Sequence, residues 1–316
     1  MSIVTLSLNP TIDLATEADL VRPTHKIRTE NETYDPGGGG VNVARVITEL
    51  GGRATALCAA GGFTGMMLDD LLGAIPIPRV VVPIAGMTRI SLMVYERRSG
   101  NEYRFTPSGP ALSESEIDAC LAAAREMDCT YFVASGSVPH GVADNVLVRF
   151  AEIAAEKGAR FVLDTSGVGL RGALGRAPVY LVKPSFGELE TLTGRHLDDE
   201  SARDAARGLV ASGAAEIVTV TMGAAGALLV TRDTVLRMWS PKIKTRSAVG
   251  AGDSFLGAMT LALSEGRTIE DALMFGIAAG AATCLTPGTG LCARADVKRL
   301  YADLRKATSD DGRAAS

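Results

Sequence analysis

One short segment of the chain combines the residue types that phosphoryl transfer to a hydroxyl group requires. The segment "SAVGAGDSF", residues 247–255, contains Gly250, Ala251 and Gly252. Glycine permits left-handed turns and carries no Cβ, so successive backbone N–H groups can point together at an anion, and the dipole of a following helix adds partial positive charge. Asp253 comes next, where a carboxylate can take a proton from an attacking hydroxyl. An acid in a first helical turn can also serve as a simple cap, but the preceding glycines favour the catalytic interpretation.

A second glycine cluster precedes another helical segment. In "DPGGGGVNVAR", residues 35–45, four glycines are followed by Asn42, whose amide can hydrogen-bond the hydroxyl groups of a ligand. A flexible turn is the alternative interpretation. Asn42 stands where G-x-G-x-x-G needs its third glycine, which argues against a dinucleotide fingerprint. The chain has no Gly-Lys dipeptide, which excludes a Walker A loop.

Composition limits the classes of protein to which the chain can belong. The chain has 316 residues, 47% hydrophobic and 22% charged, enough for a large core. A formal net charge of −4 gives no general attraction to nucleic acid or anionic lipid, so we expect a small-molecule partner and neither nucleic acid nor membrane. The amino terminus lacks signal-peptide features, and we expect a cytoplasmic protein. Five separated cysteines and three isolated histidines favour buried free thiols over a zinc or histidine metal centre.

The glycine-rich segments need a scaffold, and the hydrophobic pattern predicts one. Predicted strands cover residues 3–8, 55–60, 131–135, 160–164, 179–184, 216–221 and 226–230, and predicted helices include 40–51, 114–126, 145–158 and 201–213. This alternation predicts an α/β fold with a doubly wound, mostly parallel sheet flanked by helices. We expect one domain over residues 1–306 and a disordered tail over 307–316.

Two segments break the alternation. Residues 13–35 are polar and lack a helical period, while residues 88–105 have the pattern of a hairpin that turns at Ser99-Gly100. We expect both to form a small β-sheet outside the core, a lid over a ligand cleft.

Several motifs together resemble the ribokinase-like (pfkB-family) carbohydrate kinases. They are "DPGGGGVNVAR", "VLDTSG", "LVKPSFGELETLTG", "VTVTMGAAGALLV" and "SAVGAGDSFLGAM", in the family's order and across nearly the whole chain. Within the family, "LNPTID", "EYRF" and "GTGLCA" are most similar to the ATP-dependent 6-phosphofructokinases of ribokinase type. The resemblance implies a central doubly wound sheet, a β-lid that builds a homodimer, and ATP with Mg²⁺ as co-substrate.

The same resemblance implies roles for individual residues. Asp253 would be the general base, and Gly250, Ala251 and Gly252 would hold the γ-phosphate. The sugar phosphate would contact Asp13, Gly38, Gly39, Asn42, Arg89, Arg104, Ser137 and Lys26. A turn role for Asp13 and simple solvation of the two hairpin arginines are the alternatives without the family. Solvation is the better interpretation for Arg97 and Arg98, next to the hairpin turn.

Nucleotide and metal contacts follow in the same way. The nucleotide would contact Lys183, Ser185, Glu188, Thr221, Gly223 and Gly226. Glu188 would hold Mg²⁺ through water. Backbone carbonyls of Ser247, Val249, Thr286, Gly288 and Gly290 would hold K⁺.

The chain departs from the family pattern in places. Ser185 replaces the usual Asn after Lys-Pro, so that Mg²⁺ positioning would depend more on Glu188 and water, and Thr286 and Gly290 replace an Asn and an Arg. Related 1-phosphofructokinases and tagatose-6-phosphate kinases carry Gly-Gly-Lys-Gly where this chain has four glycines, residues 37–40. The sequence therefore favours transfer from ATP to the 1-hydroxyl of fructose 6-phosphate. Those two kinases, a nucleoside or free-sugar kinase, and a non-catalytic sugar-phosphate binding protein are the alternatives.

Overall fold

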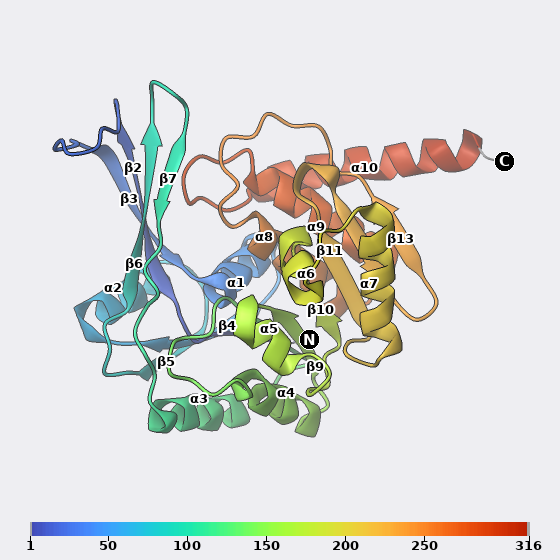
Figure 1. Ribbon diagram of the computed structural model, residues 1–316, viewed down its shortest axis with the longest axis horizontal. Coiled ribbons are helices and arrows are strands. Elements are labelled where there is room, and N and C mark those ends of the chain that lie inside the picture. Colours follow the sequence, from blue (N-terminus) through green and yellow to red (C-terminus); the bar gives the residue numbers. More distant parts are fainter. Residues whose placement is uncertain (1, 315–316) are drawn as a thin grey trace.

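The computed structural model describes residues 2–314 and contains two separate sheets (Figure 1). The larger sheet has nine strands in the order β13-β12-β11-β10-β9-β8-β1-β4-β5. Their bounds are β1 (Ile3–Ser7), β4 (Ala54–Ala60), β5 (Arg79–Pro83), β8 (Tyr131–Ser135), β9 (Arg160–Asp164), β10 (Leu181–Val182), β11 (Ile217–Thr221), β12 (Ala227–Val230) and β13 (Val235–Met238). The strands from β11 to β5 are parallel, and β12 and β13 add an antiparallel edge.

Helices cover both faces of this sheet, as the alternating pattern predicts. One face packs against α1 (Gly39–Glu49), α2 (Gly62–Gly73), α8 (Ala251–Ser264), α9 (Ile269–Thr283) and α10 (Arg294–Ala314). The other face packs against α3 (Glu114–Glu126), α4 (Val146–Glu156), α5 (Gly167–Ala173), α6 (Phe186–Thr193) and α7 (Asp199–Ala211). Side chains of the central strands are buried on both faces, which is why these strands are continuous apolar runs in the sequence.

The strand order reverses beside β1, whose neighbours are β4 and β8. In open α/β sheets, ligands bind in the crevice outside the carboxyl ends of the strands at such a switch point. The polar residues that follow β1, β8, β9 and β10 therefore meet at one edge of the sheet.

The second sheet has the order β3-β2-β6-β7 and we call it the lid. It consists of β2 (Thr11–Ala18), β3 (Glu30–Gly37), β6 (Arg89–Glu96) and β7 (Glu102–Phe105), so the two segments predicted outside the core do form strands of one small sheet. Its β2 and β6 pair in parallel, whereas β3 and β7 are antiparallel to their neighbours. Figure 1 shows the lid rising from the main body beside α1 and α2.

Some boundaries differ from the sequence predictions. Strand β10 is shorter than the predicted 179–184, because it lies between Pro178 and Pro184 and the second of these has no N–H to continue the ladder. Strands β5 and β13 were not predicted; both are edge strands with few buried residues, so their alternation is weak.

Two further predictions concern the carboxyl-terminal segment and the burial of the cysteines. Helix α10 is continuous to Ala314 through most of the predicted disordered tail, 307–316, and residues 315 and 316 lie outside the described residues. The five thiols are free, but Cys129 and Cys284 are only partly buried. Within residues 2–314, no helix is both long and apolar enough to cross a bilayer.

Candidate active site

The amino terminus of α8 has the geometry predicted for an anion site. Gly250 precedes the helix in the left-handed region, with φ of 72°, and a side chain there would collide with Leu291. A Cβ at Gly252 would lie 3.5 Å from the Nζ atom of Lys183. The first turn of α8 and a lysine ammonium thus lie side by side, which suits a phosphoryl group.

Asp253 lies in the first turn of α8 and faces Asn42 of α1. Asn42 Nδ2 donates a 2.8 Å hydrogen bond to Oδ2 of Asp253. Loss of hydration, reinforced by the nearby charge of Asp164, raises the pKa of Asp253 to about 7. A carboxyl with that pKa can accept a proton near neutral pH.

An ion pair lies beside the same helix end. Lys183 Nζ is 3.1 Å from Oδ1 of Asp164, and the lysine side chain is only 5% exposed. Burial raises the pKa of Asp164, while the attraction of Lys183 opposes that shift. Sequence reasoning predicted Lys183 but missed Asp164, although an acid at the carboxyl end of a buried strand, inside "VLDTSG", was the available signal.

The glycine cluster brings α1 against β1 and β8. Gly38 caps α1 with φ of 97°, and a Cβ at Gly39 would lie 2.4 Å from Ser135 Oγ and 2.5 Å from the backbone nitrogen of Gly136. Only glycine fits this contact. The cluster is therefore required for backbone packing that holds Asn42 opposite Asp253, and not only for ligand approach.

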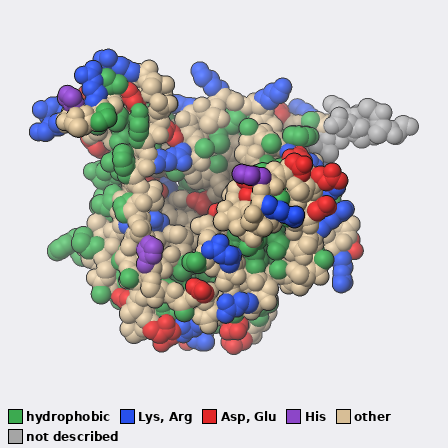
Figure 2. Space-filling view, in the orientation of Figure 1, with side chains coloured by type: hydrophobic (Ala, Val, Ile, Leu, Met, Phe, Trp, Pro, Cys, Tyr) green, Lys and Arg blue, Asp and Glu red, His purple; other side chains and the backbone are tan. Residues whose placement is uncertain are grey.

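Asp13 lies on the lid strand β2 and is buried. Loss of hydration raises the pKa of its carboxyl to about 6, although the charge of Arg45 opposes this shift. A Cβ at Gly37 would overlap the Asp13 carboxylate, so the first glycine of the cluster makes room for this acid. The charge of Asp13 contributes to the raised pKa of Asp253, so the two carboxyls are close enough to interact. Figure 2 shows a hollow between the lid and the main body, with acidic side chains visible inside it.

Arg89 and Ser137 are held through Asn9. The side-chain amide of Asn9 donates to Ser137 Oγ at 2.9 Å, and the backbone carbonyl oxygen of Asn9 accepts from Arg89 Nη2 at 3.0 Å. Arg89 Nη1 donates to the carbonyl of Pro107, and its Nε is buried with no partner among the described residues. A cation and a hydroxyl are thus anchored by one residue, an arrangement that suits a phosphate. Asn9 was missed as a site residue, although it lies in the quoted "LNPTID".

Two further predicted substrate residues, Arg104 and Lys26, also lie on the lid. Arg104 is opposite Met93 in the β6–β7 register and so shares a face with Arg89, but its guanidinium pairs with Glu102 at 2.8 Å. Lys26 is exposed in the loop between β2 and β3, which Figure 1 shows at the end of the lid farthest from α8.

A cavity of about 440 Å³ lies on the other side of the α8 amino terminus. Its lining includes Ala251 and Gly252 together with the predicted nucleotide residues Thr221, Gly223 and Gly226. Sequence reasoning missed the apolar part of the lining, Ile243, Phe255, Ile277, Ala281 and Cys284, since such residues look like ordinary core. The cavity is apolar at one end and bordered by α8 amides at the other, which fits a base with phosphates attached.

Ser185 and Glu188 form a capping box at the start of α6. The Glu188 carboxylate accepts from the backbone nitrogen of Ser185 at 2.7 Å and from its hydroxyl at 2.9 Å. The described residues contain no cluster of three or more His, Cys, Asp or Glu side chains that could hold a metal ion. Mg²⁺ usually keeps several waters and binds one or two carboxylates plus substrate phosphates. The charge of Glu188 helps to raise the pKa of Asp164, so the two acids are close enough to suit a metal delivered with the nucleotide.

The two segments predicted to hold a monovalent cation lie side by side. The amide of Arg246 donates to the carbonyl of Cys284, and Ser247 Oγ accepts from the amide of Val249 at 3.3 Å. Thr286 Oγ1 donates to the carbonyl of Leu291, so the loop that contains Gly288 and Gly290 is closed on itself.

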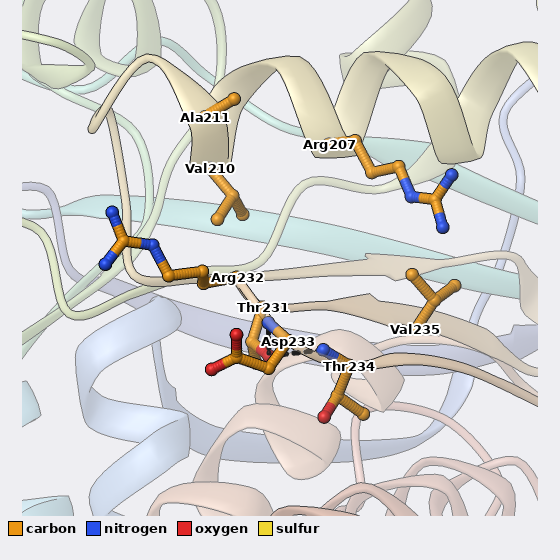
Figure 3. Close-up of a pocket in the computed structure, with 8 residues that line it drawn as sticks. All are labelled: Arg207, Val210, Ala211, Thr231, Arg232, Asp233, Thr234 and Val235. Atoms are coloured by element: carbon orange, nitrogen blue, oxygen red, sulfur yellow. Dashed lines mark hydrogen bonds between the residues drawn. The ribbon is translucent and has the colours of Figure 1, made fainter.

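A larger cavity, of about 590 Å³, lies far from these residues (Figure 3). It is lined by α7 and the β12–β13 turn, with Arg207, Arg232 and Asp233 among its residues. Because β12 is antiparallel to β11, this turn lies at the amino end of the parallel strands, opposite the predicted site. Size alone therefore does not identify the site.

Comparisons with known proteins agree with the geometry. A model of the pfkB family of carbohydrate kinases matches residues 6–296. The ATP-dependent 6-phosphofructokinase isozyme 2 of Mycobacterium tuberculosis is 44% identical over 302 residues, which cover 95% of this chain and 88% of that relative.

Solved structures show the same likeness. The structure of phosphofructokinase-2 from Escherichia coli in complex with potassium has a TM-score of 0.92 and 40% identity, and covers 96% of this chain and 99% of that chain. The structure of the same E. coli enzyme in complex with fructose-6-phosphate has a TM-score of 0.90 and 39% identity, with the same coverage.

Proposed function

The chain belongs to the pfkB family of carbohydrate kinases, and on that premise we propose that it transfers the γ-phosphoryl group of ATP to the 1-hydroxyl of fructose 6-phosphate. The products are fructose 1,6-bisphosphate and ADP. The observation that carries this proposal is the place of Asp253, between a cleft lined by Asn42 and Asp13 and a cavity lined by Gly252. The general base thus lies between an acceptor site and a nucleotide site. ATP and sugar phosphates are cytoplasmic metabolites, so we also propose a cytoplasmic location.

In this mechanism, the acceptor binds under the lid. Asp13 accepts hydrogen bonds from its hydroxyls, and Asn42 donates hydrogen bonds to them. Arg89 and Ser137 bind its 6-phosphate. Asp253 removes the proton of the 1-hydroxyl as that oxygen attacks phosphorus. The amides of Gly250, Ala251 and Gly252 stabilise the charge on the transferred group.

The nucleotide occupies the 440 Å³ cavity, beside Thr221, Gly223 and Gly226. The ammonium group of Lys183, which lies next to Gly252, offsets the negative charge of its phosphates. Mg²⁺, when bound to the nucleotide, neutralises phosphate charge, and Glu188 would hold it through water. We also propose that backbone carbonyls of Ser247, Val249, Thr286, Gly288 and Gly290 bind K⁺; the potassium complex of the E. coli relative supports this.

We propose that the outer face of the lid forms a homodimer. Tyr34, Leu14, Leu92 and Phe105 are cross-strand neighbours and form one apolar row over all four strands. Tyr34 and Phe105 are exposed, and the lid has two open edge strands. Such a surface favours pairing with a second copy. The E. coli relative also has a tetrameric inhibited form.

A coupled assay that follows ADP release tests the reaction. Purified protein is given ATP, Mg²⁺ and, in turn, fructose 6-phosphate, fructose 1-phosphate, tagatose 6-phosphate and ribose. We expect the highest kcat/KM with fructose 6-phosphate. A clear preference for fructose 1-phosphate or tagatose 6-phosphate would show that the protein is one of the two related kinases instead.

A further inference from the structure

Arg45 lies one turn after Asn42 on α1 and contacts three groups at the base of the lid. Its Nη1 donates to the carbonyl of Pro36 at 2.7 Å and to Oδ1 of Asn42 at 3.4 Å. Its Nη2 forms an ion pair with Oδ1 of Asp35 at 3.1 Å, and the arginine side chain is only 14% exposed. None of the residue roles described above uses this guanidinium.

The contact with Asn42 decides which way that amide points. A guanidinium has donors only, so the atom of Asn42 that faces Arg45 must be the oxygen. The NH₂ group must then face Asp253, to which it donates at 2.8 Å. Without Arg45, Asp253 alone holds the amide in this orientation, and only while its carboxylate is ionised, because a protonated carboxyl can also donate to the amide oxygen.

Asp35 connects the same guanidinium to the lid and to the loop after α9. Its Oδ1 pairs with Arg45, while its Oδ2 accepts from Thr289 Oγ1 at 2.9 Å. Gly288, next to Thr289, packs against Ala15 and Met93 of the lid. One carboxylate therefore joins lid strand β3, helix α1 and the 285–291 loop.

The charges around Arg45 make its removal costly. Asp13 and Asp35 are directly opposite each other in the β2–β3 register, so their carboxylates repel. Arg45 and Arg89 are the cations that act on Asp13, from α1 and β6, and Asp253 lies beyond Asn42. Arg45 thus neutralises a pair of acids of which one is the proposed sugar ligand.

We propose that Arg45 is a positioning residue for this reaction: it orients the Asn42 amide toward Asp253 and, through Asp35, fixes the lid strand that carries the sugar site. The inference rests on the proposed function, because it assigns Arg45 to the same acceptor cleft. Arg45 touches neither the sugar nor the phosphoryl group. Its effect passes through Asn42 and Asp35.

The first test is the steady-state kinetics of Arg45→Met against pH. We expect kcat/KM for the sugar phosphate to fall by about 10- to 100-fold, since small displacements of reacting groups cost about that much. KM for the sugar phosphate should rise while KM for ATP stays near its original value. Loss of a cation beside Asp13 should also raise the pKa of that carboxyl, so that the part of the kcat/KM profile that depends on Asp13 moves to higher pH.

Two further variants separate charge from geometry. Arg45→Lys keeps the charge but loses the planar fork, so we expect the acid limb near that of the unchanged protein and kcat still lowered by about tenfold. The double variant Arg45→Met/Asp35→Asn also removes the carboxylate that Arg45 had paired with. The acid limb of its kcat/KM profile should therefore return toward its original position. If the methionine variant does not fold, the lysine variant carries the test, and an unchanged kcat in that variant overturns the proposal.

Arg149→Met is the matched control. Arg149 lies on helix α4, away from the lid. Like Arg45, it is a helix arginine that pairs with acids, here the carboxylates of Glu114 and Asp118. Both variants should lower the melting temperature, and only Arg45→Met should move the pH profile. An unchanged profile in Arg45→Met, or the same change in Arg149→Met, overturns the inference. These comparisons use whichever acceptor the unchanged protein prefers, so a failure of the fructose 6-phosphate assignment is recognised separately.

Discussion

Asn42 and Asp253 are 211 residues apart in the chain, and a 2.8 Å hydrogen bond from Nδ2 to Oδ2 joins them. It connects the first helix after the glycine cluster to the first turn of α8. The bond fixes the orientation of the carboxylate: Asn42 holds Oδ2, and Oδ1 is left to face an acceptor hydroxyl. Proton transfer from the acceptor hydroxyl to Asp253 depends on this orientation.

Asp253→Asn should remove the base while keeping the shape of the site. We expect kcat to fall by about 10²–10⁴-fold, the range typical of a lost general base. The asparagine oxygen can still accept from Asn42, so binding of the sugar phosphate should persist. Initial rates give the first quantity and calorimetric titration gives the second. Equal kcat in the two proteins would exclude Asp253 as the base, and loss of binding together with rate would indicate a structural role.

The pKa of Asp253 predicts how activity depends on pH. Its carboxyl titrates at about 7 instead of the ordinary 3.8, chiefly because hydration is lost. The base acts only when ionised, so kcat/KM should rise with pH through about 7 and then level off. A rate profile between pH 5 and 9 tests this. A profile that is flat from pH 5 upward would mean that the base titrates with an ordinary pKa.

The same shift predicts an effect on stability. The folded-state pKa lies above the unfolded value of 3.8, so ionisation of Asp253 disfavours the folded state, increasingly from about pH 4 to about pH 7 and fully above that. Asp253→Asn avoids this cost. Its melting temperature relative to the unchanged protein should therefore be higher at pH 8 than at pH 5. The opposite trend would mean that the folded protein stabilises the ionised form.

Arg89→Ala tests whether the acceptor carries a phosphate. A hydrogen bond to a charged group contributes about 1.5–3 kcal/mol, so kcat/KM for fructose 6-phosphate should fall by at least about tenfold. The control is Arg97→Ala, because Arg97 lies on the same hairpin but pairs with Glu17 and Glu30. Nearly unchanged turnover in the Arg89 variant would favour a kinase for an unphosphorylated sugar or nucleoside.

Ser185 and Glu188 allow capping to be separated from metal handling. Ser185→Asn keeps a good helix cap, whereas Ser185→Ala should destabilise the protein by about 1 kcal/mol. Glu188→Gln should raise the Mg²⁺ concentration needed for half-maximal rate, if Glu188 holds the metal through water. Chemical denaturation and Mg²⁺ titrations measure the two effects. An unchanged Mg²⁺ requirement would leave Glu188 with the capping role alone.

The apolar row on the lid predicts the oligomeric state. Phe105→Asp places a charge in that row and should convert a dimer to monomers, as measured by sedimentation velocity. Val168→Asp is the control, since Val168 is similarly exposed but lies on α5. A Phe105→Asp protein that remains dimeric would show that the outer face of the lid is not the interface.

The sequence predicted the residues whose chemistry is carried by local pattern. Gly250, Asp253 and Asn42 are recognisable because each lies in a glycine-rich segment that leads directly into a helix. Asp35 and Asn9 were missed because each has a partner distant in the chain: Thr289 is 254 residues from Asp35, and Ser137 is 128 residues from Asn9. Helical spacing alone marks Arg45 as an ordinary surface arginine. Arg104 was predicted to share a face with Arg89, as the register shows, while its pairing with Glu102 depends on rotamers that periodicity does not specify.

The most direct test of the central claim is a crystal structure with fructose 6-phosphate and a non-hydrolysable ATP analogue. The terminal phosphorus should lie over the amides of Gly250, Ala251 and Gly252. The 1-hydroxyl should lie about 2.6–3.2 Å from an Asp253 carboxylate oxygen, as a base requires. A terminal phosphate bound elsewhere, or a hydroxyl held away from Asp253, would contradict the account.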